Sequence, residues 1–361
     1  MRWLLHEARP TRFRTRALAM MAALPPLSAT VRAARMLDHA MVPALRHTDV
    51  VAPLFVIGHP RSGTTFLHRL LALDHARFTT AEAWQALFPS IVAQRVIRQA
   101  MAWRGGAHPL GRLAADLGDR LFAAAAPFHA SGWREPEEDS LFLLHLCAAI
   151  HLTSTAEPDV YDPTWLADLA DPEATRRWMA WYRASVRRHL ADAANGPPGR
   201  TYLSKSPQFT GWIRGLTEAF PDARFVMLVR DPEEAVASYL RGRLGLLLAF
   251  RPDARTTDPA LRAAVARSAT LYRHAEALWG SIPASQRHRV RYVDLVRDPA
   301  ESVRSIYAHF RWSLPSGMLG DPLFSSGSGR IPRRAPPLRS YGMRRRDVEA
   351  LLGGLREQIG A

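Results

Sequence analysis

The fold of this chain is decided by the stretch Leu54-Phe55-Val56-Ile57-Gly58-His59-Pro60-Arg61-Ser62-Gly63-Thr64-Thr65-Phe66. The apolar run at its start predicts a strand, and the apolar pattern that begins at Phe66 predicts a helix. Between them lies a loop of Gly, Ser and Thr. Such a loop points backbone N–H groups and hydroxyls at one spot, where the helix dipole adds positive potential. The stretch therefore predicts a strand–loop–helix unit that binds phosphate.

The positively charged residue of this loop lies at a different position from the lysine of a Walker A loop, which is typical of nucleotide hydrolases. Gly58 and Gly63 stand at the positions of the Walker A glycines. Thr64, however, stands where Walker A has Lys, and the positive charge comes earlier, from Arg61. This departure favours a chemistry other than nucleotide hydrolysis, and the loop carries no requirement for magnesium or another metal.

Lysine is almost absent from the chain. Lys and Arg together number 48, yet Lys205 is the only lysine. An ammonium is a compact, strongly hydrated point charge, whereas a guanidinium is a planar fork, so the two differ most at special sites. The survival of one Lys among so many Arg predicts a position where Arg will not serve.

Composition limits the function classes. A net charge of +15 favours anionic partners, but the short Arg clusters, the absence of zinc-finger spacing and the absence of an RNP-like aromatic motif argue against nucleic acid. The single cysteine, Cys147, excludes an internal disulfide and is expected to be buried in its apolar run. We therefore expect a cytoplasmic protein, with peripheral contact to the inner face of the membrane left open.

Repeated strand–turn–helix patterns indicate the fold class. Strands are predicted at 54–57, 224–229 and 290–293, and a helical pattern follows each of them. We expect an α/β, P-loop-type, three-layer fold with a central parallel sheet and a large helical insertion. The expected divisions are an N-terminal helical extension (1–48, broken at Pro25-Pro26), a main domain (49–315, insertion about 83–195) and a C-terminal loop and helix packed on the domain (316–361, helix about 345–358).

A second anion-binding element follows the strand at 224–229. Arg230 ends that strand, Pro232 begins a helix, and Ser238 lies two turns into it. A guanidinium and a hydroxyl in this arrangement can both reach a second phosphate. In parallel sheets such ligands bind beyond the carboxyl ends of the strands, so both elements are expected to face one crevice.

Together these motifs resemble the sulfotransferases that use 3′-phosphoadenosine 5′-phosphosulfate (PAPS), in particular bacterial members of the family. The resemblance covers roughly Val50 to Phe310 and rests on the order and spacing of four motifs. They are His59-Pro60-Arg61-Ser62-Gly63-Thr64-Thr65-Phe66, Lys205-Ser206-Pro207, Arg230-Asp231-Pro232 with Ser238, and Tyr292-Val293-Asp294-Leu295.

The resemblance implies a role for each cofactor-site residue. Arg61, Ser62, Gly63, Thr64 and Thr65 would hold the 5′-phosphosulfate of PAPS, while Arg230 and Ser238 would hold its 3′-phosphate. Phe66 and Tyr292 would contact the adenine. Lys205 would lie beside the bridging oxygen and the transferring sulfuryl group, where negative charge develops.

The chain departs from the family pattern at the position where many relatives carry the general base. Many relatives carry a His shortly after the Lys-Ser-Pro segment, where this chain has Gln208 and Phe209. Our first candidate is Glu82, and the second is the acidic cluster Glu135-Pro136-Glu137-Glu138-Asp139, represented by Glu138.

These features predict sulfuryl transfer from PAPS to a hydroxyl of a small-molecule, lipid or carbohydrate acceptor, giving a sulfate ester and 3′-phosphoadenosine 5′-phosphate (PAP). Two alternatives stay open at this point. One is a P-loop kinase or NTPase, and the other is a basic protein that binds nucleic acid or a membrane surface.

Overall fold

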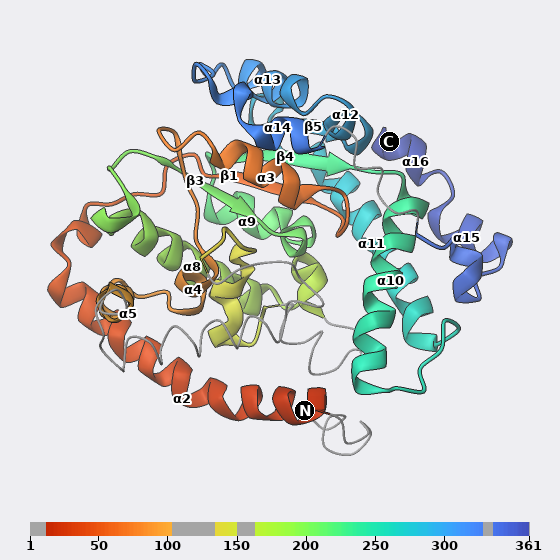
Figure 1. The fold of residues 1–361 in the computed structure, drawn as a ribbon, viewed down its shortest axis with the longest axis horizontal. Coiled ribbons are helices and arrows are strands. Elements are labelled where there is room, and N and C mark those ends of the chain that lie inside the picture. The colour runs from red at the N-terminus through yellow and green to blue at the C-terminus, as the bar shows by residue number, and fades with distance from the viewer. Residues whose placement is uncertain (1–11, 103–133, 150–162, 328–334, 361) are drawn as a thin grey trace.

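A computed structural model describes residues 12–102, 134–149, 163–327 and 335–360. Their centre is a five-stranded parallel sheet with the order β2-β3-β1-β4-β5 (Figure 1). The strands are β1 (Leu54–Gly58), β2 (Phe78–Thr79), β3 (Thr201–Lys205), β4 (Arg224–Val229) and β5 (Arg287–Arg291). The expected α/β fold with a central parallel sheet is therefore confirmed.

The central strand β1 is buried on both faces, as its continuous apolar run predicts. Phe55 faces one layer, where it stacks on Phe225 of β4 and packs against Tyr182. Leu54 and Val56 face the opposite layer. Two apolar cores, one on each face, make the three-layer arrangement.

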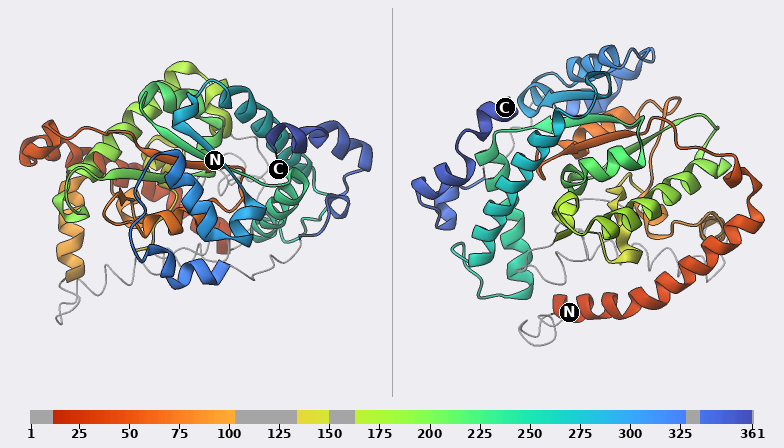
Figure 2. Two further views of the ribbon diagram at one scale, coloured as in Figure 1. Left: turned by 90° about the horizontal axis from the view of Figure 1, so that it is seen from above. Right: turned by 180° about the vertical axis from the view of Figure 1, so that it is seen from behind.

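Helices cover both faces of the sheet. The Leu54 face packs against α3 (Thr64–Ala72), α12 (Tyr292–Arg297), α13 (Pro299–His309) and α14 (Pro322–Gly327). The Phe55 face packs against α8 (Pro172–Ala191), α9 (Ile213–Ala219), α10 (Pro232–Phe250) and α11 (Pro259–Trp279). Figure 2 shows the sheet enclosed between these helices from two further directions.

The described parts of the segment between β2 and β3 consist of helices joined by loops, with one isolated bridge between Glu82 and Pro136. The segment contains α4 (Ala83–Leu87), α5 (Ile91–Ala102), η3 (Asp139–Leu146), η4 (Pro163–Leu169), α8 and η5 (Ala193–Asn195). These elements lie past the β2 edge of the sheet and over its Phe55 face (Figure 1). The remaining parts of the expected insertion, 103–133 and 150–162, lie outside the described residues.

The N-terminal helix α2 (Arg12–Met41) runs along the rim of the molecule (Figures 1 and 2). The expected break at Pro25-Pro26 is wrong, because the helix continues through both prolines. Both lie on its exposed side, where carbonyl groups left without a donor can bind water. A short turn, η1 (Pro43–Arg46), then leads to β1. The division of the chain at residues 48 and 315 stays a prediction.

Several local expectations are wrong. The last strand is β5 at Arg287–Arg291, not 290–293, because this edge strand is only half-buried and its sequence lacks an apolar pattern. The expected terminal helix divides at Gly353-Gly354 into α15 (Arg345–Leu352) and α16 (Leu355–Ile359). Cys147 is exposed, because it takes a left-handed conformation that ends η3. The expected loop after residue 316 contains η8 (Met318–Gly320), α14 and η9 (Leu338–Tyr341).

In the described part of the chain, none of the helices has the length and hydropathy that a membrane-spanning segment needs.

Candidate functional site

The predicted site residues follow the carboxyl ends of all five strands. Along the sheet from β5 to β2, these ends carry Tyr292, Arg230, the loop 58–65, Lys205 and Glu82. This edge is where ligands of open parallel sheets bind. Residues separated by more than 200 positions in sequence are therefore brought to one edge of the molecule.

The loop after β1 depends on two glycines. Gly58 has φ +147°, and a Cβ there would lie 2.6 Å from the Leu228 carbonyl oxygen. Gly63 caps α3 with φ +96°, and a Cβ there would lie 2.9 Å from the Tyr292 ring. Only glycine fits both the backbone conformation and the space.

Two hydroxyl groups brace this loop from within. Thr210 Oγ1 accepts from the Gly58 N–H at 2.8 Å and donates to the Gly58 carbonyl at 2.9 Å. Ser62 Oγ donates to the His59 carbonyl at 2.6 Å and is fully buried. The Ser62 hydroxyl is thus engaged inside the loop. Thr64 and Thr65 form the first turn of α3, with Thr64 buried and Thr65 half-buried.

Three guanidinium groups gather beside this loop. Arg61 Nε donates to Ser238 Oγ at 3.3 Å, and Arg230 donates to the Arg61 carbonyl at 3.0 Å. The pKa of Arg61 is lowered by burial and by the nearby charges of Arg241 and Arg230. Such crowding of like charges is unfavourable until an anion enters.

Neighbouring residues fix the position of the Arg230 side chain, but they do not use all of its hydrogen-bond donors. Its guanidinium lies 4.4 Å from the centre of the Tyr292 ring, and it pairs at 3.2 Å with Glu234, which is largely exposed. Its Nε is buried and has no hydrogen-bond partner among the described residues. The cluster therefore offers an unused donor to an incoming oxyanion.

The two predicted adenine contacts differ in their surroundings. Tyr292 begins α12 and lies between Gly63 and the Arg230 guanidinium, within the cation cluster. Phe66 is half-buried and packs against the apolar core formed by α3, α12 and α13.

Lys205 ends β3 and is fully buried. Its Nζ lies 3.3 Å from Glu138 Oε1 and 3.7 Å from Glu137 Oε1, and both carboxylates are buried. Burial, together with the charge of Lys205, lowers the pKa of His68 on α3 to about 3. Lys205 thus lies between the acidic cluster 135–139 and helix α3, which follows the loop after β1.

A second buried network supports this ion pair. Asp139 accepts hydrogen bonds from Tyr182 and Ser204, and Ser204 directly precedes Lys205 on β3. Burial raises the pKa of Asp139 to about 6, while the hydrogen bonds from Tyr182 and Ser204 act in the opposite direction. These contacts hold the backbone on both sides of the Lys205–Glu138 pair in place.

The acidic segment and the Glu82 segment lie side by side. The Ala83 N–H donates to the Glu135 carbonyl at 3.1 Å, and the Glu137 N–H donates to the Ala81 carbonyl at 3.3 Å. His68 Nε2 lies 3.0 Å from Thr80 Oγ1. The two predicted base candidates, Glu82 and Glu138, are therefore neighbours, although they belong to distant parts of the sequence.

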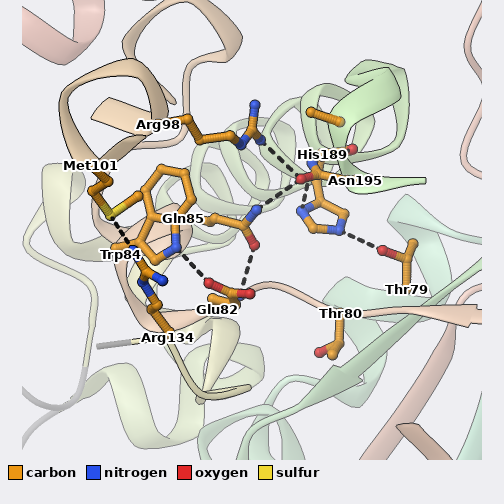
Figure 3. A pocket seen from close by; sticks show the side chains of 11 residues that line it. Thr79, Thr80, Glu82, Trp84, Gln85, Arg98, Met101, Arg134, His189 and Asn195 are labelled. Atoms are coloured by element: carbon orange, nitrogen blue, oxygen red, sulfur yellow. Dashed lines mark hydrogen bonds between the residues drawn. The ribbon is translucent and has the colours of Figure 1, made fainter. Parts of the chain in front are cut away.

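Glu82 faces a cavity of about 640 Å³ past the β2 edge of the sheet (Figure 3). Its carboxylate accepts from Trp84 Nε1 at 2.6 Å. Burial raises the pKa of Glu82, and the Trp84 hydrogen bond partly opposes this shift. The cavity is lined by Thr79, Thr80, Glu82, Trp84, Gln85, Arg98, Met101, Arg134, His189, Ala194 and Asn195.

His189 lines this cavity, and both nitrogens of its ring have hydrogen-bond partners. Asn195 Nδ2 lies 3.3 Å from Nδ1, and Nε2 lies 2.8 Å from Thr79 Oγ1. The side-chain Oδ1 of Asn195 accepts from Gln85 and Arg98, so Asn195 Nδ2 donates to Nδ1 of His189, and Nε2 of His189 carries the ring proton. Burial lowers the pKa of His189 to about 3. This imidazole is a poor proton acceptor at neutral pH.

Sequence reasoning missed Arg241 and Thr210, and it named Glu137 only as a member of the acidic cluster. Arg241 lies three residues after Ser238 on α10, a helical spacing that could have revealed it. Glu137 adjoins Glu138, but the sequence does not show which carboxylate points at Lys205. Thr210 carries no sequence signal. Among the described residues no group of His, Cys, Asp and Glu is arranged to hold a metal ion.

Comparisons of sequence place these residues in a wider group. A sequence profile of the sulfotransferase family matches residues 53–316. Two curated relatives, named omega-hydroxy-beta-dihydromenaquinone-9 sulfotransferase Stf3, come from Mycobacterium bovis and Mycobacterium tuberculosis. Each is 26% identical over 270 residues, which covers 71% of this chain. The chain spans 62% of the length of these relatives.

Solved structures share the fold. Sulfotransferase STF9 from Mycobacterium avium aligns with a TM-score of 0.71 and 21% identity over 96% of this chain and 85% of its own. Sulfotransferase STF1 from Mycobacterium tuberculosis aligns with a TM-score of 0.64 and 20% identity over 92% of this chain and 83% of its own.

Proposed function

This chain belongs to the sulfotransferase family, and on that premise we propose that it transfers a sulfuryl group from PAPS to a hydroxyl of a lipid acceptor. The observation that carries the proposal is the cluster of Arg61, Arg230 and Arg241 beside a glycine loop at the start of α3. Crowded guanidinium groups, an unused buried donor and a helix N-terminus together suit a ligand with two anionic groups.

The residues of this edge fit PAPS, which carries a 5′-phosphosulfate and a 3′-phosphate. In the proposal, the loop from Arg61 to Thr65 binds the 5′ group through backbone N–H groups and the hydroxyls of Thr64 and Thr65. Arg230 and Ser238 bind the 3′-phosphate, with Arg241 beside them. The adenine contacts would come from Phe66 and Tyr292. Bound there, PAPS supplies an activated sulfuryl group whose leaving group is PAP.

Lys205 is proposed to stabilise the charge that develops on the leaving oxygen. The acceptor oxygen forms a bond to sulfur, the bond from sulfur to the bridging oxygen breaks, and its electron pair stays on PAP. An ammonium in a buried site stabilises this growing charge more strongly than it would in water. Reaching that oxygen requires Lys205 to exchange part of its contact with Glu138, which is 3.3 Å away.

Glu82 is the base that the geometry favours. Glu138 is occupied by the Lys205 ammonium, and a paired carboxylate is a weaker proton acceptor. Glu82 faces the cavity, and burial raises its pKa towards the range of a useful base. In the proposal, the acceptor hydroxyl transfers its proton to the Glu82 carboxylate as the oxygen attacks sulfur.

The acceptor proposal rests on the cavity and on the relatives. Trp84 and Met101 give the cavity an apolar side, while Glu82, Gln85 and Arg98 give it a polar side. This combination suits a hydroxyl at the end of an apolar chain. The two Mycobacterium relatives are named for a hydroxylated menaquinone derivative, which is a lipid of that type.

The test is transfer of labelled sulfate from PAPS to farnesol in detergent, with sorbitol as the polar comparison. We expect label to enter farnesol and not sorbitol. Glu82→Gln keeps the size of the side chain but removes the proton acceptor, so turnover should fall by about a hundredfold or more while PAP binding is retained.

The matched control is Glu135→Gln, which alters an exposed carboxylate of the neighbouring segment and should leave turnover unchanged. Full turnover in Glu82→Gln, together with loss in Glu138→Gln, would show that Glu138 is the base. An absence of PAP binding by the wild-type chain would overturn the proposal itself.

A further inference from the structure

Helix α2 buries two charged side chains and leaves an apolar side exposed. The buried side carries Arg35 and Asp38 together with Leu24 and Val31. The opposite side, called here the outer face, consists of Ala22, Pro26, Ala29, Ala33, Met36 and Ala40, with Leu37 and Met41 beside it, and all eight are exposed. A surface helix of a globular protein ordinarily shows the reverse arrangement.

Buried ion pairs fix this orientation. Asp38 accepts from Arg188 Nε at 2.8 Å, from Ser90 Oγ at 3.0 Å and from the Val92 N–H at 2.8 Å. The Arg35 guanidinium lies 3.8 Å from the centre of the Trp181 ring. Rotating α2 to bury its apolar side would separate Asp38 and Arg35 from their partners and leave buried charges without compensation. The outer face therefore stays exposed.

Large apolar side chains dominate the C-terminal half of the outer face. Met36 is 74% exposed, Leu37 50% and Met41 61%. Val96 of the adjoining helix α5 is 64% exposed, one turn beyond Val92, which contacts Asp38. Exposed apolar side chains of this size, on α2 and on the helix that packs against it, indicate a contact with another apolar phase.

The charge around this surface identifies the partner. Helix α5 has no carboxylate, and the single carboxylate of α2 is the buried Asp38. Exposed cations are Arg32 on α2 and Arg95 on α5, whose Nε lies 3.7 Å from the buried Asp192 carboxylate, and the net charge of the chain is +15. Basic and apolar side chains together suit an anionic lipid surface. A second copy of the chain would instead bring like charges together.

We propose that the outer face of α2, with Val96 of α5, docks on an anionic membrane surface. Met36, Leu37, Met41 and Val96 enter the boundary between headgroups and acyl chains, and Arg32 and Arg95 contact the headgroup phosphates. Helix α5 also lines the Glu82 cavity through Arg98 and Met101. Docking thus places the cavity beside the lipid phase, a consequence that rests on the proposed function, whereas docking itself does not.

The test is co-sedimentation of the full chain with phosphatidylcholine vesicles, with and without about 30% phosphatidylglycerol. We expect binding that needs phosphatidylglycerol and weakens with added salt. The double variant Met36→Gln/Leu37→Gln should weaken binding at least about tenfold, because two exposed apolar side chains no longer enter the lipid. Arg95→Gln should weaken it less and lower its salt dependence.

The matched control is Leu169→Gln/Leu248→Gln, which replaces two exposed apolar side chains elsewhere on the surface and should leave vesicle binding unchanged. PAP binding, measured on every variant, reports an intact fold. Absence of vesicle binding by the wild-type chain, or equal binding by both double variants, would overturn the proposal. So would a solution dimer that Met36→Gln/Leu37→Gln dissociates, because the outer face would then bind a second copy.

Discussion

Lys205 shares a buried position with two carboxylates, so its loss affects stability as well as activity. Its Nζ lies within 3.7 Å of both Glu137 and Glu138. Sequence reasoning selected Lys205 because it is the only lysine in an arginine-rich chain. It could not identify which carboxylate is nearest, because adjacent side chains in an acidic run point in different directions.

Removing the charge of Lys205 should destabilise the fold. Lys205→Met leaves buried carboxylates without their cation, which is expected to lower the free energy of unfolding by about 3–5 kcal/mol. The double variant Lys205→Met/Glu138→Gln should recover part of this loss, because one stranded charge is removed. Urea unfolding of both variants measures the difference. Equal stability of the two would show that the ion pair contributes little.

At the scale of single elements, the apolar strands were the most predictable. β4 appears as predicted and β1 within one residue, since each is buried on both sides and reads as a continuous apolar run. β5 was misplaced because it is an edge strand, and β2 was missed because it has two residues. Arg61 and Arg230 of the cation cluster were predicted, because both belong to sequence motifs. Arg241 was missed, because it lies one turn of α10 beyond the motif residue Ser238.

The loop after β1 provides a test at this scale. Gly63→Ala should destabilise the fold by about 1–3 kcal/mol and weaken PAP binding, because φ is +96° and the new Cβ meets the Tyr292 ring. Gly199→Ala is the control, since φ there is +86° but no atom lies within 4 Å of the new Cβ. Thermal unfolding and PAP titration of both variants check this. Equal effects would mean that backbone strain alone matters.

At the scale of the whole molecule, buried histidines control the response to acid. Burial lowers the pKa values of His59, His145 and His288 to about 4, and those of His68 and His189 to about 3. In the unfolded chain the same groups bind protons below about pH 6.5. The unfolded state therefore binds more protons, and stability falls as the pH drops from about 6.5 through 4.

In that window, each of these histidines lowers the free energy of unfolding by at most about 1.4 kcal/mol for each pH unit of acidification. Asp139 and Glu82 act in the opposite sense, because burial raises their pKa values, that of Asp139 to about 6, and their contribution is lost as the pH rises. Five groups outweigh two, so the free energy of unfolding should be lower at pH 5 than at pH 7.5. Urea unfolding at the two values checks this, and an unchanged midpoint would contradict it.

His288→Gln gives the matched control for this acid response. His288 lies on the edge strand β5, away from the cation cluster, with Nε2 3.2 Å from Ser305 Oγ. Replacing His288 should reduce the pH dependence of the free energy of unfolding by the contribution of one histidine. It should leave PAP binding unaltered.

The arrangement of strand ends explains why the sequence revealed the proposed phosphate-binding elements better than the proposed acceptor side. The residues proposed to bind anions stand in local motifs, each within one strand–turn–helix unit. The cavity is formed by the end of β2, by parts of α4, α5, α8 and η5, and by Arg134, which are distant in sequence and share no motif. Its lining becomes apparent only when packing brings these elements past the β2 edge.

The central claim is that separate strand ends bind the two phosphate groups of one nucleotide. Calorimetric titration with PAP and with AMP, which lacks the 3′-phosphate, tests it most directly, with replacement of the exposed Arg297 by Ala (Arg297→Ala) as the control. We predict that the wild-type chain and the control bind PAP at least about tenfold more tightly than AMP, and that Arg230→Ala abolishes this preference while leaving AMP affinity intact. Equal affinity of the wild-type chain for PAP and AMP, or equal weakening of both by Arg230→Ala, would contradict the account.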